Sequence, residues 1–381
     1  MTVTHAEQPA FIVLEDGYAL AGRPYGAQGS TIGEAVFVTA MTGYQETLTD
    51  PSYHRQIVIQ TAPHIGNTGI NHDDNESSHM WVAGYVLRDP SRIRSNWRSS
   101  HTLDQELAEQ NIIGIAEVDT RALTRHLRDK GVMRAGIFSG DIARKPIHEL
   151  TEQVRKAPSM AGAELASEVS RLNVETYPAT GQKKFSIAAV DCGVKANSLA
   201  LLQASGAEVH VVPADTSYAT IESLGVDGVF FSNGPGDPAT AVEHVEVIRE
   251  LLRQRIPVFG ICFGNQLLGR ALGFDTYKLP FGHRGVNQPV MDVETGRVEI
   301  TAHNHGFAVD VPLHQVVHAP YSEDFGRVKV SHIGLNDQVV EGLQCLDIPA
   351  FSVQFHPEAA AGPHDSEHLF ARFLSMIEQH S

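Results

Sequence analysis

The sequence has few cysteines, and they lie far apart. Among its 381 residues there are three, Cys192, Cys262 and Cys345. An odd number at wide spacing argues against a disulfide framework, and without a C-x-x-C pair a thiolate zinc site is not expected. This cysteine usage predicts a reducing, cytoplasmic setting.

Long apolar runs and basic tracts are also missing. No apolar stretch approaches the roughly 18 residues that a membrane helix needs. The segment 1–7 has no basic region followed by an apolar core, so we expect no signal peptide. With 29 Lys and Arg against 45 Asp and Glu, the formal net charge is −16. That acidity argues against general nucleic-acid binding and against adsorption to anionic lipid.

The first part of the chain predicts a β-rich α/β domain, 1–145. A hairpin is expected at its start, because Asp16-Gly17 tolerates the positive φ of a tight turn between two apolar segments. The expected strands are 11–14, 18–20, 34–39, 56–61 and 135–138, and the expected helices are 103–110 and 120–130. From 146 to 184 we expect a linker region with one short helix near 147–156, since Pro and Gly interrupt 177–184.

The remaining part, 185–381, alternates between strand and helix patterns. Such alternation predicts βαβ units and a parallel sheet. We expect a mixed, mainly parallel sheet flanked by helices, with an antiparallel extension between 290 and 355. The expected strands are 185–190, 208–212, 228–231 and 257–261, and the expected helices are 195–204, 216–224, 239–253, 265–272 and 365–379.

The strongest chemical signal is Gly260-Ile261-Cys262-Phe263-Gly264, where a buried strand turns into a helix. The pattern G-x-C-x-G matches the G-x-S-x-G nucleophile elbow, with sulfur in place of oxygen. The following helix offers free N–H groups and a positive dipole end, which favour a thiolate. Cys262 is therefore the candidate nucleophile, whereas Cys192 and Cys345 are expected to be structural.

A thiolate needs a base, and the base needs an orienting group. His356 and Glu358 supply both, because residues two apart on an extended segment point to the same side. His356 lies 94 residues beyond Cys262, so the fold would have to assemble the triad. A Gly-rich turn, 232–238, follows the expected strand 228–231 and could present backbone N–H groups to an oxyanion. It is not a phosphate loop, because G-x-x-x-x-G-K-[ST] is absent.

Together these three segments resemble class I, triad-type glutamine amidotransferases, and most closely the small subunits of carbamoyl-phosphate synthetases. Further motifs support the narrower resemblance, which spans about 14–373. They are Met41-Thr42-Gly43-Tyr44-Gln45-Glu46, Asp50-Pro51-Ser52-Tyr53, Pro63-His64-Ile65-Gly66-Asn67, Asp119-Thr120-Arg121 and Thr301-Ala302-His303-Asn304-His305-Gly306-Phe307.

The resemblance implies glutamine hydrolysis with Cys262 as nucleophile, His356 as base and Glu358 as its orienting partner. It also implies oxyanion donors at the backbone N–H groups of Phe263 and Gly234. The positions that match glutamine-binding residues are Ser52, Gly234, Gly236, Phe263, Gln266, Asn304, Gly306 and Phe307. Asn265 stands where many relatives have His, and Phe355 where some have Gly, which leaves the loop geometry near the thiol open.

The resemblance further implies a heterodimer with a large subunit. That partner would use ATP, Mg and bicarbonate to make carbamoyl phosphate for arginine or pyrimidine biosynthesis, while this chain would carry no cofactor. The amino-terminal domain would dock the partner through an exposed apolar patch. Two alternatives remain at this point: a stand-alone cysteine amidohydrolase of the same fold, and a catalytically silent scaffold subunit.

A metal site is not expected from the sequence. His303 and His305 lie two apart on a predicted strand and resemble a ligand pair. A site needs three or four ligands, however, and no carboxylate or Cys lies at a matching spacing. His283 follows a glycine and is expected in a loop.

Overall fold

The computed structural model describes residues 9–380 and forms two compact units, Met1–Met160 and Ala161–Ser381. The segment predicted as a linker contributes secondary structure to both. Helix α4 (Ile147–Lys156) belongs to the first unit and packs on its strands, and β10 (Glu175–Tyr177) joins the sheet of the second.

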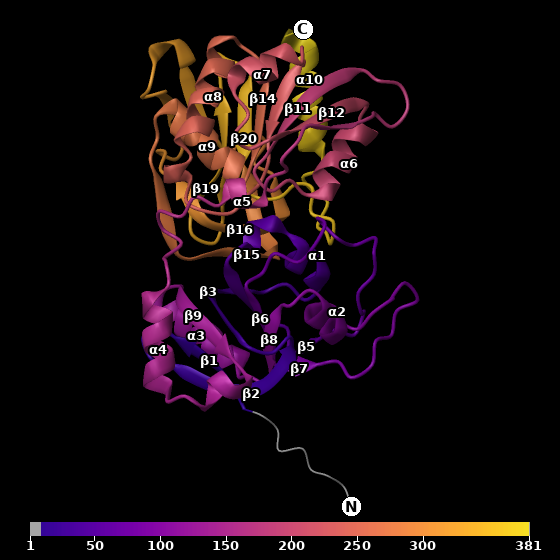
Figure 1. Cartoon of the computed structure of the whole chain (residues 1–381). Helices are drawn as coiled ribbons and strands as arrows, with labels where there is room; N and C mark the ends of the chain where they lie inside the picture. The colour runs from indigo at the N-terminus through magenta and orange to yellow at the C-terminus, as the bar shows by residue number, and fades with distance from the viewer. Residues whose placement is uncertain (1–8, 381) are drawn as a thin grey trace, which may run out of the picture. The chain divides into compact units, whose positions relative to one another are not determined.

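The first unit is built on a closed barrel with the strand order β1-β2-β8-β6-β4-β3-β9 (Figure 1). The predicted hairpin is confirmed: β1 pairs antiparallel with β2, and Gly17 in the turn has φ 93°. The barrel strands are β1 (Ala10–Leu14), β2 (Ala19–Gly26), β3 (Ser30–Val38), β4 (Gln56–Gln60), β6 (Gly84–Val86), β8 (Ile113–Ala116) and β9 (Met133–Phe138). The other elements are α1 (Tyr44–Thr49), η1 (Pro51–Tyr53), β5 (His64–Ile65), β7 (Asp89–Pro90), α2 (Leu103–Glu109), α3 (Thr120–Lys130) and η2 (Gly140–Arg144).

Side-chain alternation along β1 explains how this barrel is packed. Ile12 and Leu14 belong to a core cluster that includes Leu123 and Leu127 of α3. Val13 points to the opposite side and joins a second cluster formed with α4. Because successive strand residues face opposite sides, one strand supplies both clusters.

The second unit contains an 11-stranded sheet with the order β10-β12-β11-β13-β14-β20-β19-β18-β15-β16, and β17 pairs with β18. Strands from β12 to β20 in this order are parallel, and those from β19 onward run antiparallel, as the predicted mixed α/β fold requires. The strands are β11 (Phe185–Asp191), β12 (Ala207–Pro213), β13 (Gly228–Phe231), β14 (Val258–Ile261), β15 (Thr276–Asp292), β16 (Val298–Val309), β17 (Val316–His318), β18 (Arg327–Gly334), β19 (Val340–Cys345) and β20 (Ala350–Val353).

Helices cover both faces of the parallel part of this sheet. On one face α7, α8 and α9 bury their apolar sides in a cluster that contains Phe231, and on the other α6 and α10 pack around Phe230 and Phe259. Burial on both faces explains why these strands are continuous apolar runs. The helices are α5 (Ala166–Val169), α6 (Ala196–Ala204), α7 (Tyr218–Ser223), α8 (Val242–Arg253), α9 (Phe263–Leu272) and α10 (His368–His380), with short η3 (Pro238–Thr240) and η4 (Glu323–Phe325).

The sequence interpretation was wrong at β15. The antiparallel part was expected to begin near 290, and His283 was expected in a loop, but β15 begins at Thr276 and contains His283. Pro280, Gly282 and Gly285 looked like loop signals. They are accommodated by irregularities, since the register with β16 shifts between Lys278 and His283 and again after Gly285. Bulges of this kind tolerate Pro and Gly within a strand.

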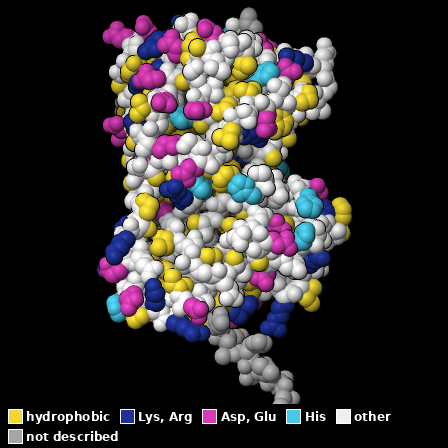
Figure 2. Space-filling view, viewed as in Figure 1, with side chains coloured by type: hydrophobic (Ala, Val, Ile, Leu, Met, Phe, Trp, Pro, Cys, Tyr) yellow, Lys and Arg dark blue, Asp and Glu magenta, His cyan; other side chains and the backbone are white. Residues whose placement is uncertain are grey.

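Two surface observations complete the description. On the face seen in Figure 2, basic and acidic side chains are interspersed over both units. Across residues 9–380, every helix is too short or too polar to cross a bilayer.

Candidate active site

Cys262 lies at a strained turn between β14 and α9. Its backbone has φ 54° and ψ −97°, a conformation that non-glycine residues rarely adopt and that marks functional positions. A side chain at Gly260 would collide with the backbone of Gly264, and one at Gly264 would collide with the carbonyl of Phe231. The flanking glycines are therefore required by close backbone approach, as the elbow interpretation predicted.

The elbow and the Gly-rich turn 232–238 lie against each other. The N–H of Gly264 donates to the carbonyl of Ser232 at 3.2 Å. Gly234 lies directly against the backbone of Cys192, where a Cβ would collide with the Cys192 carbonyl. The turn after β13 is thus fixed beside the start of α9, at the carboxyl edge of the parallel strands, where α/β proteins bind ligands.

His356 and Glu358 meet in the interior, as their spacing predicted. His356 Nδ1 lies 2.7 Å from Glu358 Oε1, and the two side chains are 1% and 0% exposed. Because an ionised carboxylate only accepts, Nδ1–H must donate, and in the neutral imidazole Nε2 then carries the lone pair. Nε2 is buried without a hydrogen-bond partner among residues 9–380. A buried imidazole with its lone pair available can act as a general base.

Glu358 is held ionised by its surroundings. Burial alone would raise its pKa, but the charges of His356 and Lys195 outweigh burial and lower the pKa to about 2. Lys195 Nζ lies 3.3 Å from Glu358 Oε1, and Asn197 donates to the Glu358 backbone carbonyl. The sequence interpretation missed Lys195. Its position just beyond the carboxyl end of β11 was the available signal, because that edge collects functional groups.

Strand β16 connects the sulfur to the imidazole. Cys262 Sγ lies 3.6 Å from the carbonyl oxygen of Asn304, and the N–H of His356 donates to the carbonyl of Ala302 at 2.8 Å. Residues two apart on a strand are separated by about 7 Å. In addition, the N–H of Cys262 donates to Val353 at the end of β20. The fold therefore places Cys262 and His356, which are 94 residues apart in the sequence, against β16 residues only two apart.

The predicted glutamine-binding residues fall into two groups. Ser52 lies in the first unit, buried on η1, where its N–H donates to Asp50. The others belong to the second unit and lie on the elbow, the Gly-rich turn and β16; they are Gly234, Gly236, Phe263, Gln266, Asn304, Gly306 and Phe307. Gln266 Nε2 donates to the carbonyl of Phe307 at 3.0 Å, which ties α9 to β16.

Asn265 and Phe355 are both fully buried. Asn265 donates to Gln354 Oε1 at 3.0 Å and accepts from Ser352 at 2.9 Å, so its amide joins α9 to β20 and the segment that follows it. Phe355 packs against His332 and His303, with ring centroids 5.4 and 6.1 Å apart. Both side chains thus have a packing role next to the triad.

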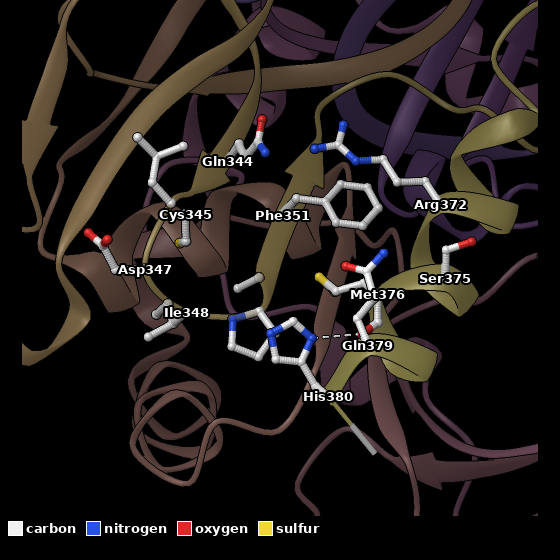
Figure 3. A pocket seen from close by; sticks show the side chains of 13 residues that line it. Gln344, Cys345, Asp347, Ile348, Phe351, Arg372, Ser375, Met376, Gln379 and His380 are labelled. Carbon is white, nitrogen blue, oxygen red and sulfur yellow. Dashed lines mark hydrogen bonds between the residues drawn. The ribbon is translucent and has the colours of Figure 1, made fainter.

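A cavity of about 420 Å³ lies elsewhere, near the beginning of β20 (Figure 3). It is lined by Cys345, Phe351 and residues of α10, and Arg372 covers the ring of Phe351 at 4.5 Å. None of the predicted catalytic or glutamine-binding residues lines it. Burial raises the pKa of Cys345 to about 12 and also raises that of Cys192, which keeps both thiols protonated.

Two family models match this chain, one in each unit. The family model of class-I glutamine amidotransferases matches 188–376, which covers the elbow and the His356–Glu358 pair. The model described as the CPSase domain of the carbamoyl-phosphate synthase small chain matches 12–137. The second unit is therefore a class-I glutamine amidotransferase domain.

Relatives match over nearly the full length. The carbamoyl phosphate synthase small chain of Streptomyces avermitilis is 61% identical over 373 residues, covering 98% of this chain and 97% of the relative. Those of Streptomyces coelicolor and Bifidobacterium longum are 60% and 57% identical, covering 97% and 98% of this chain and 96% and 95% of the relatives. The chain belongs to the family of carbamoyl phosphate synthase small chains. This confirms the predicted role as a glutaminase subunit, and a stand-alone hydrolase is not favoured.

Proposed function

We propose that this chain hydrolyses the side-chain amide of L-glutamine through a thioester on Cys262. The observation that carries the proposal is the buried His356–Glu358 pair, with the Nε2 lone pair available and β16 joining it to the sulfur. A second support is the strained φ of Cys262, which places its side chain at the start of α9.

The proposed reaction has two halves. His356 Nε2 takes the thiol proton, and the sulfur attacks the carbonyl carbon of glutamine. The N–H groups of Phe263 and Gly234 stabilise the oxyanion, where losing one donor typically costs roughly 3–4 kcal/mol of barrier. His356 then returns the proton to the leaving ammonia. Water cleaves the γ-glutamyl thioester, which releases glutamate and restores the thiol.

Within the second unit, the glutamine would be held by Gly234, Gly236, Phe263, Gln266, Asn304, Gly306 and Phe307. A zwitterionic amide needs both donors and acceptors, and Gln266 and Asn304 provide both. Gln266 is fixed in place by its bond to Phe307, so its remaining polar atom has a defined direction. Such preorganisation lowers the cost of ordering the side chains on binding.

We further propose that ammonia passes to a large subunit, which uses ATP, Mg and bicarbonate to make carbamoyl phosphate for arginine or pyrimidine biosynthesis. The heterodimer would work in the cytoplasm, in keeping with three free cysteines. In the first unit, the segment between β7 and α2 exposes Ile93 by 76% and Trp97 by 92%. Exposed Trp is typical of interface anchors, so Trp97 is the first residue to test for docking.

The activity is tested with Cys262→Ser in the complex with the large subunit. We expect glutamine-dependent synthesis of carbamoyl phosphate to be lost while ammonia-dependent synthesis continues. If both activities vanish together, the proposed division of labour is wrong. Cys345→Ser is the matched control, because that thiol is also buried but lies away from the elbow, and it should keep both activities.

Docking is tested separately with Trp97→Ala. Removing a central aromatic anchor should weaken association with the large subunit by roughly tenfold or more, measured by titration calorimetry. Leu172→Ala is the control, since Leu172 is 89% exposed but lies in the second unit. Equal affinity of the two variants would contradict the docking proposal without affecting the hydrolysis.

A further inference from the structure

Four side chains that the triad does not use converge in the interior of the second unit. They are His283 on β15, His303 and His305 on β16, and Glu341 on β19, and one ligand atom from each lies within 4.8 Å of the others. The side chains of His303 and His305 are 1% exposed and that of Glu341 is 0% exposed, while His283 is 12% exposed. The fold therefore supplies the third imidazole and the carboxylate that the sequence spacing did not reveal.

Hydrogen bonding fixes the tautomer of His303. The hydroxyl of Thr301 donates its only proton to the carbonyl of Gln288 at 2.9 Å. Thr301 Oγ1 also lies 2.7 Å from His303 Nε2, so it must accept the Nε2–H. The Nδ1 atom of His303 is then a lone pair that points toward the cluster.

Hydrogen bonds also orient the other two histidines. His305 Nδ1 lies 2.9 Å from the carbonyl of Phe307, so it carries the proton and Nε2 is the lone pair. His283 Nε2 lies 2.7 Å from Asp337 Oδ2 and donates to it, which turns Nδ1 toward Glu341. Metal-binding histidines almost always donate their second N–H to such a carboxylate, carbonyl or similar acceptor.

Two lone pairs consequently face each other. His303 Nδ1 and His305 Nε2 are 3.3 Å apart, and with these tautomers neither has a proton to donate. Glu341 Oε2 lies 3.6 Å from His303 Nδ1 and has no hydrogen-bond partner among residues 9–380. Three electron-rich atoms in a buried space repel one another unless a cation or a proton lies between them.

We propose that His283, His303, His305 and Glu341 bind a divalent transition-metal ion of the zinc type. Three imidazoles and one carboxylate form a donor set that such ions accept. Tetrahedral zinc with ligands at about 2.0–2.1 Å places neighbouring ligand atoms about 3.3 Å apart. The separations here are 3.2 Å from His283 Nδ1 and 3.7 Å from His305 Nε2, both to Glu341 Oε1, and 3.3 Å between His303 and His305.

The site has a structural role because four protein ligands fill a tetrahedral shell and leave no open position for substrate. The site joins β15, β16 and β19. On β16, Asn304 lies between the two ligands His303 and His305. A bound ion would hold this part of β16 in register where β15 is irregular. The metal proposal does not depend on the proposed hydrolysis. It can therefore be wrong while the hydrolysis proposal stands.

The test is metal uptake by the full-length chain after removal of metal with a chelator. The protein is equilibrated with Zn²⁺ or Co²⁺, and metal content is measured by mass spectrometry alongside the visible spectrum of the Co²⁺ form. We expect one ion per chain and the intense d–d absorption of tetrahedral Co²⁺. A wild-type chain that takes up no ion, or that shows a six-coordinate Co²⁺ spectrum, overturns the proposal and points to a proton shared by the two imidazoles.

Variants show whether the ion binds at this cluster. His303→Gln and Glu341→Gln each remove one ligand and should weaken Zn²⁺ binding by at least roughly tenfold. His332→Gln is the matched control, because His332 is a buried histidine of β18 that is not part of the cluster, and it should bind Zn²⁺ as the wild type does. Equal Zn²⁺ affinity in all four proteins would place the ion elsewhere and overturn the assignment. If Glu341→Gln fails to fold, as judged by circular dichroism, the comparison of His303→Gln with His332→Gln decides.

Discussion

Two buried histidine–carboxylate groups lie in the second unit, and they differ in how the carboxylate is balanced. Glu358 contacts one imidazole and one ammonium, and these lower its pKa to about 2. Glu341 is surrounded by three imidazoles, and among residues 9–380 it forms no ion pair with Lys or Arg. Burial raises its pKa to about 7, although His283 opposes that shift. The carboxylate of the first group is paired with a lysine, whereas that of the second has, in the described part of the chain, only imidazoles as partners.

The difference shows how the same residue types serve two kinds of chemistry. In the triad, a permanently ionised Glu358 fixes the His356 tautomer and leaves one nitrogen available for proton transfer. In the cluster, hydrogen bonds outside the group fix the tautomers, and the lone pairs point inward at one another. A site for proton transfer needs one such lone pair, and a metal site needs several that converge.

The largest difference in kcat between the two groups is expected when the catalytic imidazole is removed. His356→Ala should lower kcat for glutamine hydrolysis by roughly 10³-fold or more, because the thiol loses its base. The loss of kcat in Glu358→Ala should be roughly tenfold to a hundredfold smaller than in His356→Ala, since the orientation of the base is lost while the base remains. Glu341→Gln should change kcat by less than roughly tenfold. Steady-state ammonia release measures all three, and equal losses in His356→Ala and Glu341→Gln would show that the two groups are not separate.

Acid titration tests whether Glu358 is ionised in the folded chain. The folded pKa of Glu358 is about 2, below its ordinary value of 4.5, because His356 and Lys195 favour the charged form despite burial. Its contribution to stability is complete above pH 4.5 and is lost as the pH falls toward 2. The difference corresponds to about 3 kcal/mol. Urea unfolding of wild type and Glu358→Gln should show a shallower acid-side loss in the variant, and parallel curves would contradict the assigned charge state.

The smallest expected effect concerns the support of the cluster. Thr301→Val removes the acceptor of the buried His303 Nε2–H and the donor to the partly buried carbonyl of Gln288. We expect a loss of about 1–2 kcal/mol in the free energy of unfolding with little change in kcat. Thr301→Ser keeps the hydroxyl and should retain more stability in chemical denaturation. A valine variant at least as stable as the serine variant would show that the tautomer of His303 is set by something else.

Much of the fold could be predicted because the signals were local. The turn at Asp16-Gly17 and the apolar runs at β11, β13 and β14 carried their structure within a few residues. Element ends moved by a few residues; α9, for example, starts at Phe263 instead of 265. Strand β15 was missed from Thr276 to about residue 289, since its bulges place Pro and Gly where a regular strand would exclude them.

Local sequence was enough to predict the elbow at Cys262 and the pairing of His356 with Glu358. The glycine spacing and the two-residue separation each describe geometry within a few residues. Only the tertiary structure decided that Lys195 balances Glu358 and that His283 and Glu341 join His303 and His305. Those contacts depend on strand order and register, which position Lys195 beyond the end of β11 and bring together side chains from β15, β16 and β19. The spacing of these residues in the sequence does not reveal that they are neighbours, because the sheet brings them together by pairing strands across long connections.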